Sequence, residues 1–173
     1  MSRIRVLNTS ILLFAIFLLQ ETMVSRINFP INGYSLYLAA LIVVLSLEDR
    51  NGALVFGFIG GLIMDLSVAA DTPLGQWALV FTALGYLFAL NKESIGDFTQ
   101  SPILFIIFIS AASAFSLFLF LAIGAMLGQE HGTLTHQATI ILANTFWSLL
   151  ITPIFLPVLI KIRTALLTSR ERA

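Results

Sequence analysis

The sequence contains no cysteine and few charged side chains. The absence of cysteine excludes disulfide bonds, cysteine-ligated zinc and thiol catalysis. Only 10% of the 173 residues are charged, whereas a soluble domain carries roughly 25%. The nine basic and nine acidic side chains cancel, so net charge gives no attraction to nucleic acid, and no nucleic-acid role is expected. There are too few charges to cover a surface that faces water.

Apolar side chains, by contrast, make up 58% of the chain. They gather in six runs separated by short polar segments, and a helix needs about 20 apolar residues to cross a bilayer. The pattern predicts an all-α integral membrane bundle of six transmembrane helices over 1–160, followed by a basic cytoplasmic tail, 161–173. The predicted spans are 6–24, 30–47, 53–70, 74–90, 102–127 and 137–160.

The second run is short. The apolar run from Tyr34 to Leu47 has only 14 residues, two of them serines, fewer than the roughly 20 that cross a bilayer. The run therefore either recruits Ile27 to Ile31 or forms a thin, tilted or re-entrant segment.

Basic residues indicate the orientation of the spans. Short cytoplasmic segments retain Lys and Arg. The N-terminus, the second and fourth loops and the tail hold eight basic residues, whereas the other three loops hold one, Arg26. The asymmetry requires an even number of spans and predicts that both termini are cytoplasmic. Tyr34, Tyr37 and Trp77 are then expected near the outer interface. The eight are Arg3, Arg5, Arg50, Lys92, Lys161, Arg163, Arg170 and Arg172.

Asp65 is the acidic residue expected deep inside a span, whereas Glu21 lies near the outer end of the first span. It lies 12 residues into the third predicted helix, about 18 Å along it, where a charge costs roughly 2.5–3.5 kcal/mol. Two interpretations are open: a proton or ligand site, or a hydrogen-bonding residue at a contact between helices. Asn144, Ser148 and Thr152, spaced by four in the sixth span, are candidate partners for its carboxylate.

Small residues recur every three or four positions in the third and fourth predicted helices. Such rows let two helix backbones approach closely in lipid, where apolar burial alone gives no association. We therefore expect the two rows to dock as a hairpin joined through 71–73, with a row that faces another protein as the alternative. The rows are Ala53, Gly57, Gly61, Asp65 and Ala69, and Gly75, Ala78, Thr82, Gly85 and Ala89.

The residues predicted for helix packing or partner contact come mainly from these rows. Pro73 is added because it stands at the expected start of the fourth helix, where a missing N–H is tolerated. Asn144 is added from the polar row of the sixth span. The full set is Gly57, Gly61, Asp65, Pro73, Gly75, Thr82, Gly85 and Asn144.

Motifs for catalysis are missing from the sequence. It has no His-Glu-x-x-His, no nucleophile elbow and no phosphate-binding glycine loop. His131 and His136 share a short loop with Glu130, which does not provide the rigid set of ligands that a metal needs. We expect no enzyme activity, no cofactor and no metal.

One segment resembles a known family. Gly57 to Leu66 reads Gly-Phe-Ile-Gly-Gly-Leu-Ile-Met-Asp-Leu, and Thr72-Pro-Leu-Gly and Leu84-Gly-Tyr-Leu follow. This stretch resembles the rod shape-determining MreD family of bacteria, whose hallmark is a glycine-rich third helix that ends in Gly-Leu-x-x-Asp, a short link, and Leu-Gly at the start of the next helix. The likeness covers the 30 residues from Gly57 to Tyr86.

The resemblance implies a non-catalytic scaffold subunit of the cell-elongation complex, which makes peptidoglycan and sets rod shape at the bacterial cytoplasmic (inner) membrane. The implied partners are an MreC-like scaffold protein and, through it, an MreB-like filament, a RodA-like glycosyltransferase and a class B penicillin-binding protein. It assigns Gly57, Gly61, Asp65 and Gly75 a structural and partner-contact role.

A transport role is the alternative. The S components of energy-coupling-factor transporters have a similar six-helix fold, which implies a small-molecule, vitamin-type substrate-binding subunit. The short outer loops of this chain count against it, because solute pockets gather several polar groups.

Overall fold

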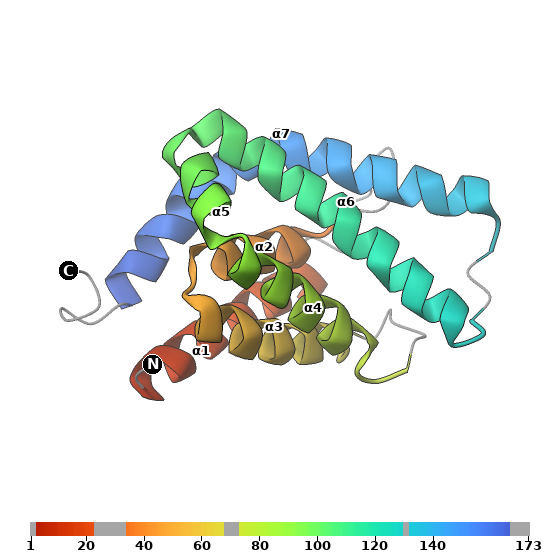
Figure 1. The fold of residues 1–173 in the computed structure, drawn as a ribbon, viewed down its shortest axis with the longest axis horizontal. Coiled ribbons are helices and arrows are strands. Elements are labelled where there is room, and N and C mark those ends of the chain that lie inside the picture. The colour runs from red at the N-terminus through yellow and green to blue at the C-terminus, as the bar shows by residue number, and fades with distance from the viewer. Residues whose placement is uncertain (1–2, 23–33, 68–72, 130–131, 167–173) are drawn as a thin grey trace.

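The computed structural model describes residues 3–22, 34–67, 73–129 and 132–166, and the described residues form seven α-helices (Figure 1). Three of them are long and apolar enough to cross a membrane, which indicates an all-helical membrane protein. The helices are α1 (Arg3–Thr22), α2 (Leu36–Leu47), α3 (Arg50–Met64), α4 (Gln76–Leu90), α5 (Lys92–Gln100), α6 (Pro102–Met126) and α7 (Leu134–Leu166), of which α1, α6 and α7 are the three long ones.

The helices run back and forth between two ends of a bundle. The start of α1, the α2–α3 turn, α5 and the end of α7 lie at one end, at the left of Figure 1. The end of α3, the start of α4, the end of α6 and the start of α7 lie at the other end. We call the first of these the charged end, because Arg5, Glu48, Lys92 and Arg163 meet there.

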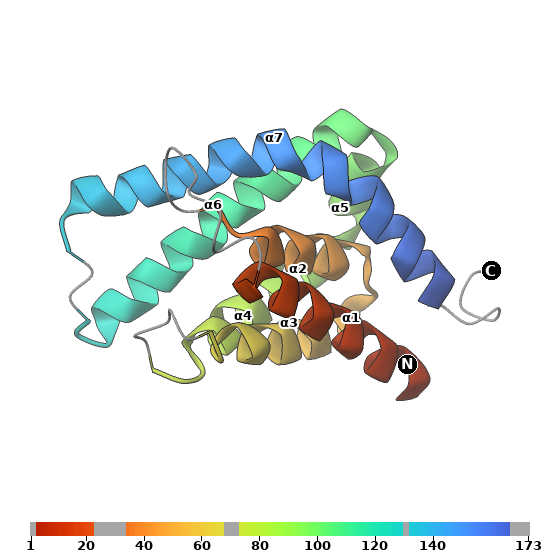
Figure 2. The same ribbon diagram turned by 180° about the vertical axis from the view of Figure 1, so that it is seen from behind.

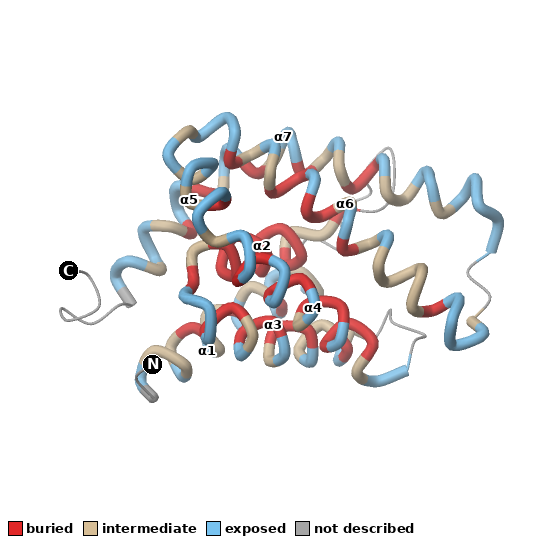
Figure 3. Tube along the Cα trace, in the orientation of Figure 1, coloured by how far each residue is buried: buried red, intermediate tan, exposed pale blue. Residues whose placement is uncertain are grey.

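The short second run forms the centre of the bundle. Helix α2 has 12 residues, ten of them buried, and packs against α1, α3, α4, α6 and α7 (Figure 3). It is about 18 Å long, less than the roughly 30 Å hydrocarbon core. Because its neighbours surround it, α2 is apolar on every side. The question whether Ile27 to Ile31 extend this run lies outside the described residues.

Three predicted boundaries differ from the structure. The third helix is 50–64 rather than 53–70, so it ends before Asp65. The polar segment expected as a loop at 91–101 contains the amphipathic helix α5, which buries Ile95 and stacks Phe98 on Phe108 with ring centroids 5.8 Å apart. The sixth span, expected at 137–160, is part of the longer helix α7, which continues into the predicted tail to Leu166.

Helix α7 contains Pro153 and Pro157, and Figure 2 shows it changing direction in its C-terminal part. The bend has a simple cause, because each proline removes one backbone N–H and crowds the preceding turn.

The long helices expose large apolar side chains. Ile103 of α6 is 71% exposed, and Leu142 and Ile154 of α7 are 69% and 75% exposed. Contiguous apolar surface of this kind is unfavourable in water, which supports contact of these helices with lipid.

At the charged end, Glu48 connects three segments of the chain. Its side chain is fully buried, and its carboxylate forms ion pairs with Arg5 of α1 and with Arg163 of α7, the latter at 2.8 Å. Arg163 also donates to the Leu47 carbonyl at the end of α2 (3.1 Å). Lys92 donates to the Ser46 carbonyl (2.7 Å), and burial lowers the pKa of its ammonium while Glu48 acts in the opposite direction.

We expect Glu48→Gln to lower the free energy of unfolding by about 3–5 kcal/mol, because two mostly buried guanidinium groups would lose their shared counter-charge. The measurement is unfolding of the purified protein in mixed detergent micelles, followed by circular dichroism. The neighbouring Asp49 is 54% exposed, so Asp49→Asn should change stability by less than about 0.5 kcal/mol. Equal effects of the two substitutions would contradict this role for Glu48.

Candidate functional site

Helices α3 and α4 pack backbone to backbone. A Cβ added at Gly61 would lie 2.5 Å from the Ala78 Cα and from the Trp77 carbonyl oxygen. A Cβ at Gly57 would overlap the Phe81 carbonyl oxygen. From the opposite helix, a Cβ at Gly85 would overlap the carbonyl oxygen of Ala53. The two rows of small residues thus face each other as a hairpin, and at these three positions only glycine fits without moving the backbone.

Asp65 connects the end of α3 to the start of α4. It is the C-cap residue of α3 and is 9% exposed. Its Oδ2 accepts hydrogen bonds from the backbone N–H groups of Gly75 (2.9 Å) and Ala78 (3.2 Å), and its Oδ1 accepts one from Trp77 (3.0 Å). The first N–H groups of a helix have no partner within the helix and carry partial positive charge. The carboxylate therefore acts as a cap supplied by the preceding helix, which we call the Asp65 cap.

This geometry corrects the prediction for Asp65. The residue lies just after its helix rather than 12 residues inside it, because α3 ends at Met64. Its two oxygens are satisfied by α4 backbone, not by the polar row of α7. That row is buried within α7, where Ser148 Oγ donates to Asn144 Oδ1 (3.3 Å).

The start of α4 also differs from the prediction. Gly75, not Pro73, is adjacent to the helix, as its N-cap, and its φ of +98° lies in the left-handed region that favours glycine. Pro73 precedes it and accepts a bond from the Gln76 N–H at 3.3 Å. Nothing in the sequence marks this conformation except the Leu-Gly pair itself.

Side chains of the first turn of α4 attach it to α6. Gln76 is buried, and its Nε2 donates to the Phe120 carbonyl while its Oε1 accepts from Gln129, both at 2.9 Å. Trp77 stacks on the Phe120 ring with centroids 4.1 Å apart. The Asp65 cap is thus fixed from three helices.

The three aromatic residues predicted near the outer interface are buried among the helices. Trp77 and Tyr34 are 7% and 8% exposed, and Tyr37 is 1% exposed. Tyr37 donates its hydroxyl to the Gly60 carbonyl (2.7 Å), a contact between α2 and α3 that sequence reasoning missed. A buried tyrosine hydroxyl usually finds a hydrogen-bond partner nearby. Here α3 provides the Gly60 carbonyl, which glycine, having no side chain, leaves accessible.

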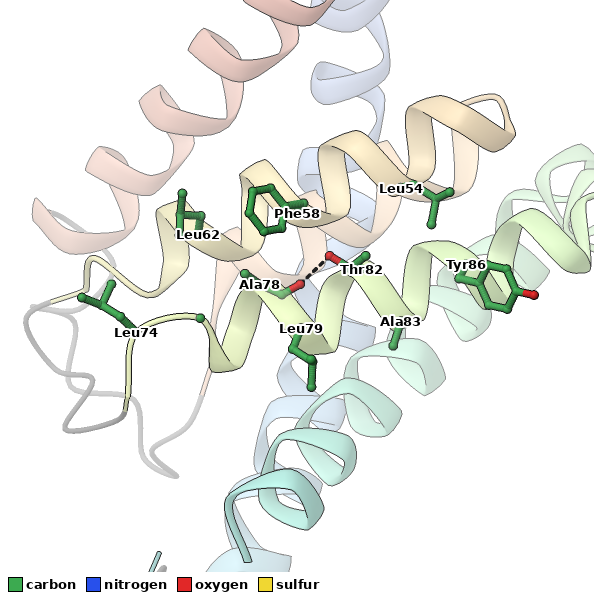
Figure 4. A pocket seen from close by; sticks show the side chains of 10 residues that line it. Leu54, Phe58, Leu62, Leu74, Ala78, Leu79, Thr82, Ala83 and Tyr86 are labelled. Atoms are coloured by element: carbon green, nitrogen blue, oxygen red, sulfur yellow. Dashed lines mark hydrogen bonds between the residues drawn. The ribbon is translucent and has the colours of Figure 1, made fainter. Parts of the chain in front are cut away.

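An apolar groove runs along the outer side of the α3–α4 pair, beside the Asp65 cap (Figure 4). Its volume is about 690 Å³. Thr82 lines it but turns its hydroxyl back to the Ala78 carbonyl (2.6 Å), so the groove presents few polar atoms. We call it the α3/α4 groove; its lining residues are Leu54, Phe58, Leu62, Leu74, Gly75, Ala78, Leu79, Thr82, Ala83 and Tyr86.

The predicted site residues therefore fall into two groups. Gly57, Gly61, Gly85 and Asp65 hold α3 and α4 together, while Gly75 and Thr82 also line the groove. Pro73 lies in the link before Gly75, and Asn144 is buried in α7 away from the Asp65 cap. The arrangement presents a rigid apolar surface, which suits binding of another apolar segment.

We expect Asp65→Ala to lower the free energy of unfolding by about 2–4 kcal/mol, because three N–H groups at the start of α4 would lose a charged acceptor. Asp65→Asn should give a smaller loss, since one acceptor oxygen remains. The exposed Asp97 of α5 is the matched control, and Asp97→Ala should stay within about 0.5 kcal/mol of the parent. Thermal unfolding in detergent checks both. A parent-like Asp65→Ala would refute the Asp65 cap.

A glycine pair tests the backbone contact. Gly61→Ala should lower the free energy of unfolding by about 2–3 kcal/mol, because the added methyl group forces α3 and α4 apart. A Cβ at Gly96 of α5 meets nothing within 4 Å, so Gly96→Ala should be neutral or stabilising by up to about 1 kcal/mol. If both variants melt with the parent protein, the close approach is wrong.

Comparison of the chain with protein-family models, with curated proteins and with solved structures gives no significant match. What the structure itself supports is an all-helical protein in which three described helices are long and apolar enough to cross a membrane.

Proposed function

We propose that this protein is a non-catalytic scaffold subunit of the bacterial cell-elongation complex, which makes peptidoglycan and maintains rod shape. It binds an MreC-like partner and, through it, acts with an MreB-like filament, a RodA-like glycosyltransferase and a class B penicillin-binding protein. It lies in the cytoplasmic membrane with six spans, a fold similar to that of the S components of vitamin transporters, and both termini in the cytoplasm.

The observation that carries the proposal is the Asp65 cap. The Gly-Leu-x-x-Asp end of one helix and the Leu-Gly start of the next are the parts of the sequence that resemble the MreD family. They are also the parts that the Asp65 carboxylate joins, through the N–H groups of Gly75, Trp77 and Ala78. A motif whose elements contact one another has one shared role, which is to fix the α3–α4 pair.

The distribution of basic residues supports the orientation. Every lysine and arginine among the described residues belongs to the segments at the charged end. Positive charge is retained on the cytoplasmic side, so this end faces the cytoplasm. Of the shorter helices, α2 packs among α1, α6 and α7, while α3 packs against α1 and α4 against α6.

The α3/α4 groove is the surface we propose for the partner. A helix is about 10–12 Å in diameter with its side chains, and the open volume of about 690 Å³ accepts one side of such a helix. Phe58 and Leu62 on α3 and Leu79 on α4 form its walls and are 53%, 42% and 56% exposed. The small side chains of Ala78 and Ala83 lie at the bottom of the groove, so a partner helix can approach the α4 backbone closely in lipid.

The transport alternative has less support. A cavity lined by Trp77, Phe120, His136 and Gln137 lies between α4, α6 and α7 at the end of the bundle away from the charged end. Its volume is about 240 Å³, below the roughly 300–1,000 Å³ of typical ligand pockets.

The experiment is an Ala→Trp pair on exposed positions. Ala83 lines the groove, so Ala83→Trp should reduce co-purification with the MreC-like partner at least tenfold and make rod-shaped cells round, because the indole occupies the space of the partner helix. A tenfold loss corresponds to about 1.4 kcal/mol of binding free energy. Pull-down from membranes and cell morphology provide the two measurements.

Ala138→Trp is the control, since Ala138 is exposed on α7 and does not line the groove. It should leave the complex and the cell shape unchanged, and both variants should melt within about 2 °C of the parent, since surface changes alter stability by less than about 0.5 kcal/mol. A normal complex and normal rods with Ala83→Trp would overturn the assignment of this groove to the partner.

A further inference from the structure

A second apolar hollow, distinct from the α3/α4 groove, lies between α1 and the C-terminal part of α7. Its volume is about 320 Å³, and α2 forms its floor. Figure 2 shows α1 and this part of α7 running to the same end, on either side of α2. We call it the α1/α7 crevice; Leu12, Ile16 and Leu19 of α1, Ala40 of α2, and Val158 and Ile162 of α7 are among its lining residues.

The crevice has less than half the volume of the α3/α4 groove. The part of α1 that lines it, from Leu12 to Leu19, is about 10 Å long. That length is about two thirds of one leaflet, which is half of the roughly 30 Å hydrocarbon core. A single flexible hydrocarbon chain fits a hollow of this size and length.

The crevice leads to the charged end. Arg5 lies seven residues before Leu12 on α1, and Lys161 and Arg163 flank Ile162 on α7. Glu48 sits between the two arginines, one carboxylate for two guanidinium groups. Lys161 is exposed, and the Arg5 and Arg163 side chains are 17% and 14% exposed.

The balance of charge at this end is positive. Its described segments hold six basic residues, Arg3, Arg5, Arg50, Lys92, Lys161 and Arg163, against four acidic ones, Glu48, Asp49, Glu93 and Asp97. Lys161 is next to Ile162, which lines the crevice. An apolar hollow that fits within one leaflet and has positive charge at its cytoplasmic mouth has the chemistry of an anionic lipid site.

We propose that the α1/α7 crevice binds one acyl chain of an anionic phospholipid, whose headgroup phosphate lies against Lys161, Arg163 and Arg5 at the charged end. The phosphate neutralises the excess positive charge above the buried Glu48. The lipid occupies the gap between α1 and α7 and stabilises the bent part of α7. The site is independent of the partner groove, with which it shares no lining residue.

Native mass spectrometry of the full-length protein, titrated with lipids of matched acyl chains, tests the proposal. Phosphatidylglycerol should bind at least tenfold more tightly than phosphatidylcholine. Inorganic phosphate at millimolar concentration should leave the melting temperature unchanged, because it lacks the chain. Equal binding of the two lipids would indicate unspecific annular contact, and stabilisation by phosphate alone would indicate a simple anion site; either result overturns the proposal.

Two variants locate the lipid. Val158→Trp fills the crevice and should weaken phosphatidylglycerol binding at least fivefold, while Lys161→Gln should reduce the preference for phosphatidylglycerol over phosphatidylcholine. Leu142→Trp, an exposed position on α7 outside the crevice, is the control and should bind as the parent does. Melting temperatures establish that each variant is folded. Parent-like binding by a folded Val158→Trp would refute the site.

Discussion

The fold depends on a carboxylate that completes another helix. The N–H groups that begin a helix have no partner within it, so where they are buried each must find one elsewhere in the protein. Asp65 provides both oxygens to the start of α4 and thereby sets the distance and register of α3 against α4. That register is what brings Gly61 onto the backbone at Ala78. The α3/α4 groove follows, because its two walls are the outer sides of the same pair.

Glu48 plays the corresponding part at the other end of the bundle. Here the connection is made by ion pairs, and the segments joined are far apart in sequence: α1, the end of α2 and the last turns of α7. A buried pair is costly to break rather than strongly stabilising to form, so its main effect is to specify one arrangement of the three segments. Between these two ends the described contacts of α2 are almost entirely apolar.

Sequence reasoning was accurate where the signal lies in side-chain type and spacing. Glycines spaced by four in α3 and small residues in α4 predicted a close hairpin, and the structure has one. Sequence reasoning was wrong about Asp65, whose carboxylate is bound by backbone N–H groups and not by side chains. Asp65 was placed inside a helix because Leu66, Val68 and Ala69 continue the apolar run, and nothing in the residue types reveals that the chain leaves the helix at Met64. Glu48 looked like a loop residue for a related reason, since its two arginines lie 43 and 115 positions away. Helix α5 was missed because it is too polar and short to resemble a span.

Each of the two buried carboxylates has an apolar hollow near it: the α3/α4 groove lies beside Asp65, and the α1/α7 crevice leads to Glu48. Gly75, which donates to Asp65, lines the α3/α4 groove, and Ile162, which precedes Arg163, lines the α1/α7 crevice. Apolar contact within a bilayer has little directional preference, since lipid chains are as apolar as leucine. A hydrogen-bonded carboxylate beside each hollow fixes the distance between the helices that line it, and so limits the positions those helices can take. The same carboxylates that stabilise the bundle therefore also determine the shape of the surfaces it offers, so a change at Asp65 or Glu48 acts on binding through the position of a helix and not through direct contact.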